Sequence, residues 1–303
     1  MAAPLGTIPT IEEQSMRLLL SLRSDLWSSP YTYKESPVRI FGGEFRVPIY
    51  TAKTWAISAN IYDESLNLGR AEFQLGKESV FIGNSLRSQS AGIGARKDFG
   101  NGSSLTVFAA SATASDDPWG NASDIWFEGT VNYRWQKTGA YQWFLALNQS
   151  NNRGFYNGKL FPYAGVSYES TDFEAAFGFP FVHITWGNLD TWKNEFLLTP
   201  FGVSLTTFKN LRENFQFRAT TGYTVRSYLH ESRSDDDDRL YYQELLAEAA
   251  LKKYVSATTG VVFALGGSGD RRLYESEHIY VPNNKMQTIN SDFYARLGLE
   301  FIL

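Results

Sequence analysis

The segment FYARLGLEFIL, from Phe293 to Leu303, decides the fold of this chain. Every second residue in it is apolar, from Phe293 to Leu303, whereas the residues between include Arg296 and Glu300. Successive side chains of a β-strand point to opposite faces, so this segment has one apolar face and one polar face. A transmembrane β-barrel, with lipid outside and a polar lumen inside, explains that contrast most directly. A soluble, aromatic-rich β-sandwich is the alternative.

The composition excludes several classes of protein. The chain has 303 residues, enough for one large domain or two ordinary ones, and it contains no cysteine. A disulfide framework and thiolate metal sites are therefore excluded. The net charge of −4 argues against nucleic acid as a partner. The mean hydropathy of −0.29 is compatible with a barrel, because only alternate residues of a barrel strand face lipid.

Segments with a period of two recur along the chain. Their apolar faces are longer than the usual globular strand of about 5–6 residues and match the ~9–11 residues that cross a membrane at a tilt. The clearest of these segments are residues 125–135, 141–148, 173–181 and 215–226. They predict an all-β, antiparallel, up-and-down transmembrane barrel.

From residue 88 onward, the connections between these segments alternate between short and long. Short turns are predicted near 99–102, 136–139, 169–172, 208–213 and 254–257. Long polar loops are predicted near 115–123, 149–159, 187–194, 230–239 and 267–287. Short turns on one side and long loops on the other are typical of outer-membrane barrels, where the turns are periplasmic and the loops extracellular.

The same parity predicts the number of strands. Eleven strands fall between residue 88 and the C-terminus, and residues 39–49 and 54–62 form a hairpin. Residues 16–27 are expected to be the first strand, with loops at 28–37 and 63–87, which gives about 14 strands in all. If 16–27 were a helix or plug instead, about 12 strands would remain. We therefore expect a periplasmic or plug segment at 1–15 and a barrel over 16–303.

Aromatic residues gather at the predicted ends of strands. Tyr133, Trp135, Tyr141 and Trp143 flank the short turn at 137–139. Tyr and Trp are enriched where a protein crosses the membrane–water interface. A second pair, Trp186 and Trp192, is expected to bracket a long loop on the opposite rim.

With these features, the chain resembles bacterial outer-membrane β-barrel proteins over nearly its whole length, and its size and strand count are similar to those of monomeric 14-stranded porins. The middle segments FEAAFGFPFVHITW and EFLLTPFGVSL are similar to an uncharacterised family of outer-membrane barrels. The resemblance implies a mature outer-membrane chain without its signal peptide. It also implies contact with outer-membrane lipids and lipopolysaccharide, and with the barrel-assembly machinery during insertion. Barrels of this class usually end in an aromatic residue, whereas this chain ends in Leu303 after an outward Phe301.

The polar faces predict a lumen of mixed charge. A barrel of about 14 strands is wider than the 8-strand size that side chains alone can fill. We therefore expect passive diffusion of small hydrophilic solutes, with no enzymatic activity, cofactor or metal, unless a loop such as 64–87 or 267–287 folds inward. The residues expected to line the pore are Arg96, Glu128, Arg134, Arg218, Arg226, Arg296 and Glu300.

Two further clusters suggest other activities. The four aspartates that begin at Asp235 lack the alternating ligands and the glycine of a calcium loop, and we interpret them as a solvated loop tip. His230 and Ser232 are two residues apart, as an outer-membrane lipid hydrolase would need for its base and nucleophile. No second motif supports that activity. The remaining alternative is a closed barrel whose long extracellular loops bind a partner or a surface polymer.

Overall fold

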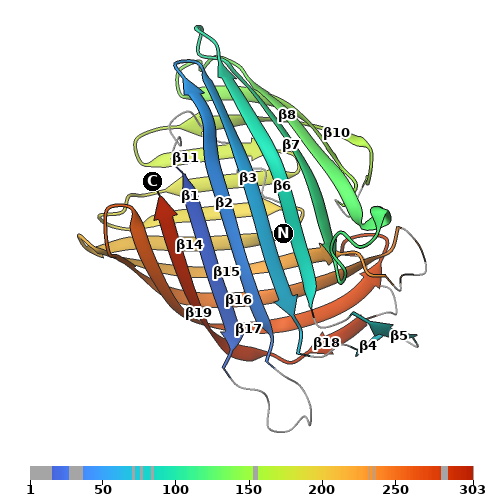
Figure 1. The fold of residues 1–303 in the computed structure, drawn as a ribbon. Coiled ribbons are helices and arrows are strands. Elements are labelled where there is room, and N and C mark those ends of the chain that lie inside the picture. Colours follow the sequence, from blue (N-terminus) through green and yellow to red (C-terminus); the bar gives the residue numbers. More distant parts are fainter. Residues whose placement is uncertain are drawn as a thin grey trace.

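The computed structural model describes residues 16–26, 37–69, 72–75, 78–82, 85–152, 156–231, 233, 235, 237–280 and 286–302. Figure 1 shows a single barrel in which the blue β1 (Arg17–Asp25) lies beside the red β19 (Asp292–Ile302). These two strands pair antiparallel from Arg17–Ile302 to Asp25–Tyr294, and β1 also pairs with β2, which closes the wall. The predicted segment 1–15 lies outside the described residues, as does Leu303.

The described wall contains sixteen strands, and each pairs antiparallel with its neighbours. After β1 they are β2 (Arg39–Ala52), β3 (Trp55–Asn67), β6 (Leu86–Asp98), β7 (Ser104–Ser115), β8 (Ile125–Arg134), β9 (Tyr141–Ser150), β10 (Leu160–Glu169), β11 (Phe173–Gly178), β12 (Phe181–Trp186), β13 (Lys193–Thr199), β14 (Gly202–Arg212), β15 (Phe215–Tyr228), β16 (Arg239–Tyr254), β17 (Thr259–Ser276) and β19. The short β18 (Met286–Ile289) pairs along the end of β17. A hairpin of β4 (Glu72–Leu75) and β5 (Glu78–Phe81) and the 3-10 helix η1 (Ala122–Asp124) lie in connections. No helix in the described ranges is long and apolar enough to span a membrane.

The predicted barrel is confirmed, but the count of about 14 strands is too low because two turns were missed. Residues 173–186 and 195–207 lie between predicted connections, so each stretch was expected to be one strand; they fold instead within the pairs β11–β12 and β13–β14. Phe179–Pro180 and Pro200–Phe201 form the turns, and proline cannot donate a ladder hydrogen bond. Gly202 follows the second turn with a φ of 150°, and a Cβ there would lie 2.1 Å from the Tyr223 carbonyl oxygen. The apolar alternation continues through these aromatic turns and hides them in the sequence.

The first missed turn moves the connection after Trp186 to the other rim, and the second restores the predicted rim of every later connection. We call the rim with connections 53–54, 99–103, 135–140, 170–172, 187–192, 213–214 and 255–258 the turn rim, and the opposite rim the loop rim. The Gly187 N–H donates to the Asp172 carbonyl oxygen at 2.8 Å, so the connection after Trp186 lies beside the turn at 170–172. Trp186 and Trp192 are therefore on the same rim as Trp135 and Trp143, and their predicted place on the opposite rim is wrong.

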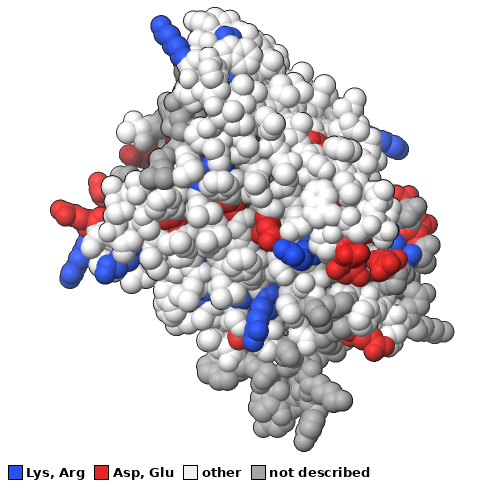
Figure 2. All heavy atoms as spheres, in the orientation of Figure 1, with Lys and Arg blue, Asp and Glu red and all other residues white. Residues whose placement is uncertain are grey.

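The outward face of the wall is apolar. Leu22 of β1, Leu297 of β19, Phe263 of β17 and Leu251 of β16 are successive register partners, and they are 39–55% exposed. Figure 2 shows a broad area with few charged side chains in its upper half, whereas charges lie across the middle and lower part of the view and at its left edge. The predicted outward face of the C-terminal strand is thus confirmed.

The interior near the loop rim is a packed apolar cluster. Its members come from opposite walls, including Ala114 of β7 and Leu240 of β16. The Leu229 N–H, just after β15, donates to the Ala114 carbonyl oxygen at 2.7 Å, so two strand ends meet across the barrel. The β4–β5 hairpin adds Phe73 and nearby Ile82, both 1% exposed. The described walls therefore contact one another at the loop rim instead of enclosing an open mouth.

The inward aromatic packing of β9–β11 predicts a strict requirement for glycine at position 165. A Cβ on Gly165 would lie 2.2 Å from Phe144 Cζ and 2.3 Å from the Phe177 backbone oxygen, and the backbone cannot yield easily. Gly165→Ala is expected to lower the free energy of unfolding by about 1–3 kcal/mol in a guanidinium titration of the detergent-folded barrel. Gly129→Ala is the matched control, because its nearest neighbour would lie at 3.9 Å. Equal effects of the two substitutions would contradict this packing.

Candidate functional site: a charge network beside a solvated lumen

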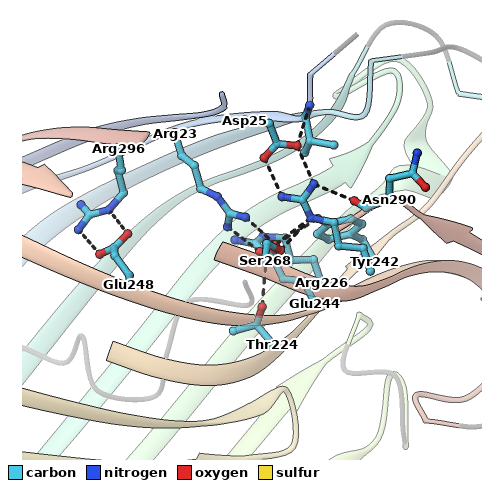
Figure 3. A network of polar contacts seen from close by, with 12 residues as sticks. Arg23, Asp25, Thr224, Arg226, Tyr242, Glu244, Glu248, Ser268, Asn290 and Arg296 are labelled. Carbon is cyan, nitrogen blue, oxygen red and sulfur yellow. Dashed lines mark hydrogen bonds and ion pairs between the residues drawn. The ribbon is translucent and has the colours of Figure 1, made fainter. Parts of the chain in front are cut away.

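Part of the lumen holds a network of charged side chains (Figure 3). Its centre is Glu244, which β16 presents to the interior because alternate residues of a strand face inward. Arg23 of β1 donates to both Glu244 carboxylate oxygens at 2.9 Å. Arg226 of β15 donates to Glu244 at 3.1 Å and, across the barrel, to Glu64 of β3 at 2.9 Å. Strands from opposite walls are thus joined through one carboxylate.

A second ion pair extends the network toward the loop rim. Arg271 of β17 donates to the two carboxylate oxygens of Asp25 at 2.6 and 2.7 Å, which is a bidentate contact. Arg271 Nε also donates to the Ser268 hydroxyl at 2.8 Å, and that hydroxyl donates to Glu244 at 2.7 Å. Ser268 therefore links both ion pairs into one cluster.

The network is balanced and almost dry. Three arginines face three carboxylates, and each of these six side chains is at most 9% exposed. We refer to Arg23, Asp25, Glu64, Arg226, Glu244 and Arg271 as the charge network. Buried charges of this kind are tolerated only when each is paired and hydrogen-bonded. The network therefore holds the two walls together and excludes water from this part of the lumen.

Nearer the turn rim, the ion pairs are less buried. Glu248 of β16 accepts hydrogen bonds from Arg296 of β19 at 2.6 and 2.9 Å and from Arg218 of β15 at 3.3 Å. Arg218 keeps 32% of its side chain exposed. Lys252 pairs with Glu300 in the same region.

Another part of the lumen is accessible to water. His183 of β12 and Glu195 of β13 are hydrogen-bonded at 2.9 Å, and their side chains are 38% and 39% exposed. The register places Glu195 opposite Thr206 of β14, whose hydroxyl lies 3.3 Å from that of Thr220 on β15. Because these groups face inward, the water that they contact is inside the barrel. We call the inward faces of β11–β15 around these residues the solvated lobe.

The residues predicted to line the pore lie in different environments. Arg226 belongs to the buried charge network. Arg218, Arg296 and Glu300 take part in the ion pairs near the turn rim, and Arg96 pairs with Asp98 at 2.8 Å. Glu128 lies inward on β8, opposite Ala110 in the register. Arg134, at the end of the same strand, is exposed and forms no ion pair among the described residues.

Sequence reasoning missed several members of these sites for a simple reason. Glu64 and Arg271 belong to β3 and β17 but lie in residues 63–87 and 267–287, which were expected to be loops, whereas Asp25 lies in the strand expected at 16–27 and was not recognised as part of a site. His183 and Glu195 lie beside the missed turns. The alternation of apolar and polar residues in β17 stops after Leu265, so the sequence carries no signal for Arg271.

The two other candidate clusters have different surroundings. His230 is fully buried, with its Nε2 3.4 Å from a carboxylate oxygen of Glu275, so it is not the exposed rim residue that a lipid hydrolase needs. Ser232 lies outside the described residues. Nearby, burial raises the pKa of Asp116, whose carboxylate accepts the Glu231 N–H at 3.1 Å. The Asp237 N–H donates to the Asp235 side chain at 2.9 Å, and the described residues contain no group of ligands that could hold a metal ion.

No family model matches the chain, and no curated protein matches it. Similar solved structures are outer-membrane β-barrel proteins. An outer-membrane channel from Pseudomonas putida F1 is 9% identical, with 98% of each chain covered and a TM-score of 0.39. The toluene transporter TodX of P. putida is 8% identical, with 95% of this chain and 90% of that chain covered and a TM-score of 0.36. OmpF of Salmonella typhi is 8% identical, with 96% of this chain and 99% of that chain covered and a TM-score of 0.36.

The strand pairing and the exposed apolar face define the class of this chain independently, as a closed antiparallel barrel of the outer-membrane type.

Proposed function

We propose that the chain is a channel of the bacterial outer membrane through which small hydrophilic solutes diffuse passively along the solvated lobe. The charge network and the apolar cluster close the rest of the lumen. The observation that carries this proposal is the contrast between two sets of inward polar groups. His183 and Glu195 are 38% and 39% exposed, whereas Glu244 is fully buried.

The mechanism is filtration by width and by electric field. The solvated lobe presents an imidazole, carboxylates, hydroxyls and the Arg218 guanidinium, so neither sign of charge dominates its lining. A mixed lining selects ions weakly. The exposed apolar row from Leu22 to Leu251 fits a position among outer-membrane lipids, with the turn rim on the periplasmic side.

A closed barrel whose loops bind a partner or a surface polymer is the second candidate. The specific observation in its favour is the backbone contact between Leu229 and Ala114, because it joins opposite walls at the loop rim. The same experiment separates the two candidates, since a barrel closed throughout carries no current.

The test uses single cysteines, which the natural chain lacks altogether. Thr206 and Thr207 are neighbours on β14, but Thr206 bonds Thr220 inside the lumen whereas Thr207 bonds Asn194 on the other face. In planar bilayers we expect the wild-type protein to give stable steps of current. A cationic thiosulfonate reagent should reduce the current of Thr206→Cys by about half or more and leave that of Thr207→Cys unchanged.

Either of two results would overturn the proposed pathway along the solvated lobe. One is insertion without current, which favours the loop-binding alternative. The other is an identical response of the two cysteine variants, which would place the pathway elsewhere in the barrel.

A further inference from the structure

The wall of the barrel is lowest at β11–β13. These strands have 6, 6 and 7 residues, whereas β16 and β17 have 16 and 18. At about 3.3 Å per residue and a tilt of about 45°, six residues rise only ~14 Å, compared with an apolar band ~25 Å tall. Trp186 and Trp192 place the turn-rim ends of β12 and β13 at the membrane–water interface. The opposite ends of these short strands therefore lie within the apolar layer.

The composition of the turns at that edge agrees with this depth. The connections β11–β12 and β13–β14 consist of Phe179–Pro180 and Pro200–Phe201, without a charged residue. The connection between β7 and β8, on the same rim, contains Asp116, Asp117 and Asp124. A turn can lie beside lipid only when its backbone polar groups are satisfied within the protein, and the Phe201 carbonyl oxygen accepts the Val225 N–H at 2.8 Å while the Phe201 N–H donates to the Thr199 hydroxyl at 3.2 Å.

Aromatic rings continue from this edge into the barrel. Phe179 is 72% exposed, and its ring centroid lies 5.9 Å from that of Phe161. Phe181 stacks on Phe144 at 5.8 Å and meets Tyr163 edge-on at 6.3 Å. Phe144 and Tyr163 are buried, whereas Phe161 and Phe181 are only partly buried against them. We call these five residues the aromatic track; it offers ring faces to a planar apolar group.

Arg134 lies at the inner end of the aromatic track. The register places Arg134 of β8 directly opposite Phe144 of β9, so their Cβ atoms are about 5 Å apart. Arg134 is exposed and forms no ion pair within the described ranges, whereas Arg96, Arg218, Arg226 and Arg296 are all paired. An unpaired guanidinium beside aromatic rings suits a carboxylate attached to a ring.

We propose that the aromatic track and Arg134 together bind a small aromatic carboxylate, whose ring packs on Phe161 and Phe181 and whose carboxylate pairs with Arg134. Because the wall is low at β11–β13, the ring can enter the barrel from the apolar layer of the membrane. This inference deepens the proposed function, on which it rests for the onward passage of the solute, because it names a class of solute for the same lumen.

Binding is measured by titration calorimetry of the detergent-folded full chain with benzoate, acetate and benzyl alcohol. Benzoate is expected to bind at least about tenfold more tightly than acetate, which lacks the ring, or benzyl alcohol, which lacks the charge. Arg134→Gln should weaken benzoate about tenfold, to the level of benzyl alcohol. Phe181→Leu should weaken benzoate and benzyl alcohol alike.

Two matched controls separate this site from general effects. Lys137→Gln removes a nearby charge that pairs with Glu169 on the turn rim, and Phe177→Leu shortens an outward ring of β11 that is 47% exposed. Both should bind benzoate as the wild type does. Equal affinity for benzoate and acetate, or unchanged affinity in Arg134→Gln, would overturn the inference. Because calorimetry needs no current, benzoate binding without conductance would reject the channel and leave this site standing.

Discussion

Glu244→Gln is expected to lower the free energy of unfolding of the barrel by about 3–5 kcal/mol, the usual cost of breaking a buried ion pair. In the charge network three positive charges meet three negative charges, so the substitution leaves one positive charge uncompensated. Glutamine still fills the space, but it cannot neutralise Arg23, whose side chain is 8% exposed. The measurement is a guanidinium titration of the detergent-folded protein, followed by tryptophan fluorescence.

Glu300→Gln is the matched control for that substitution. Glu300 pairs with Lys252 on the same inner wall, but the two side chains are 24% and 15% exposed. Water partly screens this pair, so its loss should cost about 1 kcal/mol or less. A loss of stability in Glu244→Gln no larger than in Glu300→Gln would show that the charge network does not hold the walls together.

Leu297→Arg is expected to destabilise the barrel in lipid by about 2–4 kcal/mol, because it places a charge near the middle of the apolar layer. Leu297 lies halfway along β19, is 55% exposed, and has Leu22 and Phe263 as register partners. The free energy is measured by folding the chain into vesicles at different guanidinium concentrations. The large effect is specific to lipid, since water would solvate the same arginine.

Phe293→Arg tests the depth dependence on the same face of the same strand. Phe293 is 64% exposed and lies near the start of β19, where an arginine can reach the interface. Its cost is expected to be only ~0–1 kcal/mol. If both arginines were tolerated equally, this face would not be in contact with lipid.

Much of the fold can be predicted from local patterns. The alternation in Phe293–Leu303, repeated along the chain, depends only on the period of a strand, and the structure confirms both the barrel and the outward face of β19. The strand count fails because Phe179–Pro180 and Pro200–Phe201 look like part of an apolar strand. A turn inside the apolar layer lacks the polar residues by which turns are usually recognised.

The site was less predictable than the wall. Alternation can place Arg226 on an inward face, but it cannot show whether water or another wall lies opposite. Glu64 and Glu244 are 180 residues apart, yet both bind the same guanidinium because the barrel closes and its walls meet. Whether a segment forms a strand, and which face of that strand is polar, depend on a few neighbouring residues in the sequence. The pairing across the lumen, the dry charge network and the lack of an ion pair for Arg134 among the described residues depend on how sixteen strands curve around one interior, because burial and charge compensation arise only when distant strands come together.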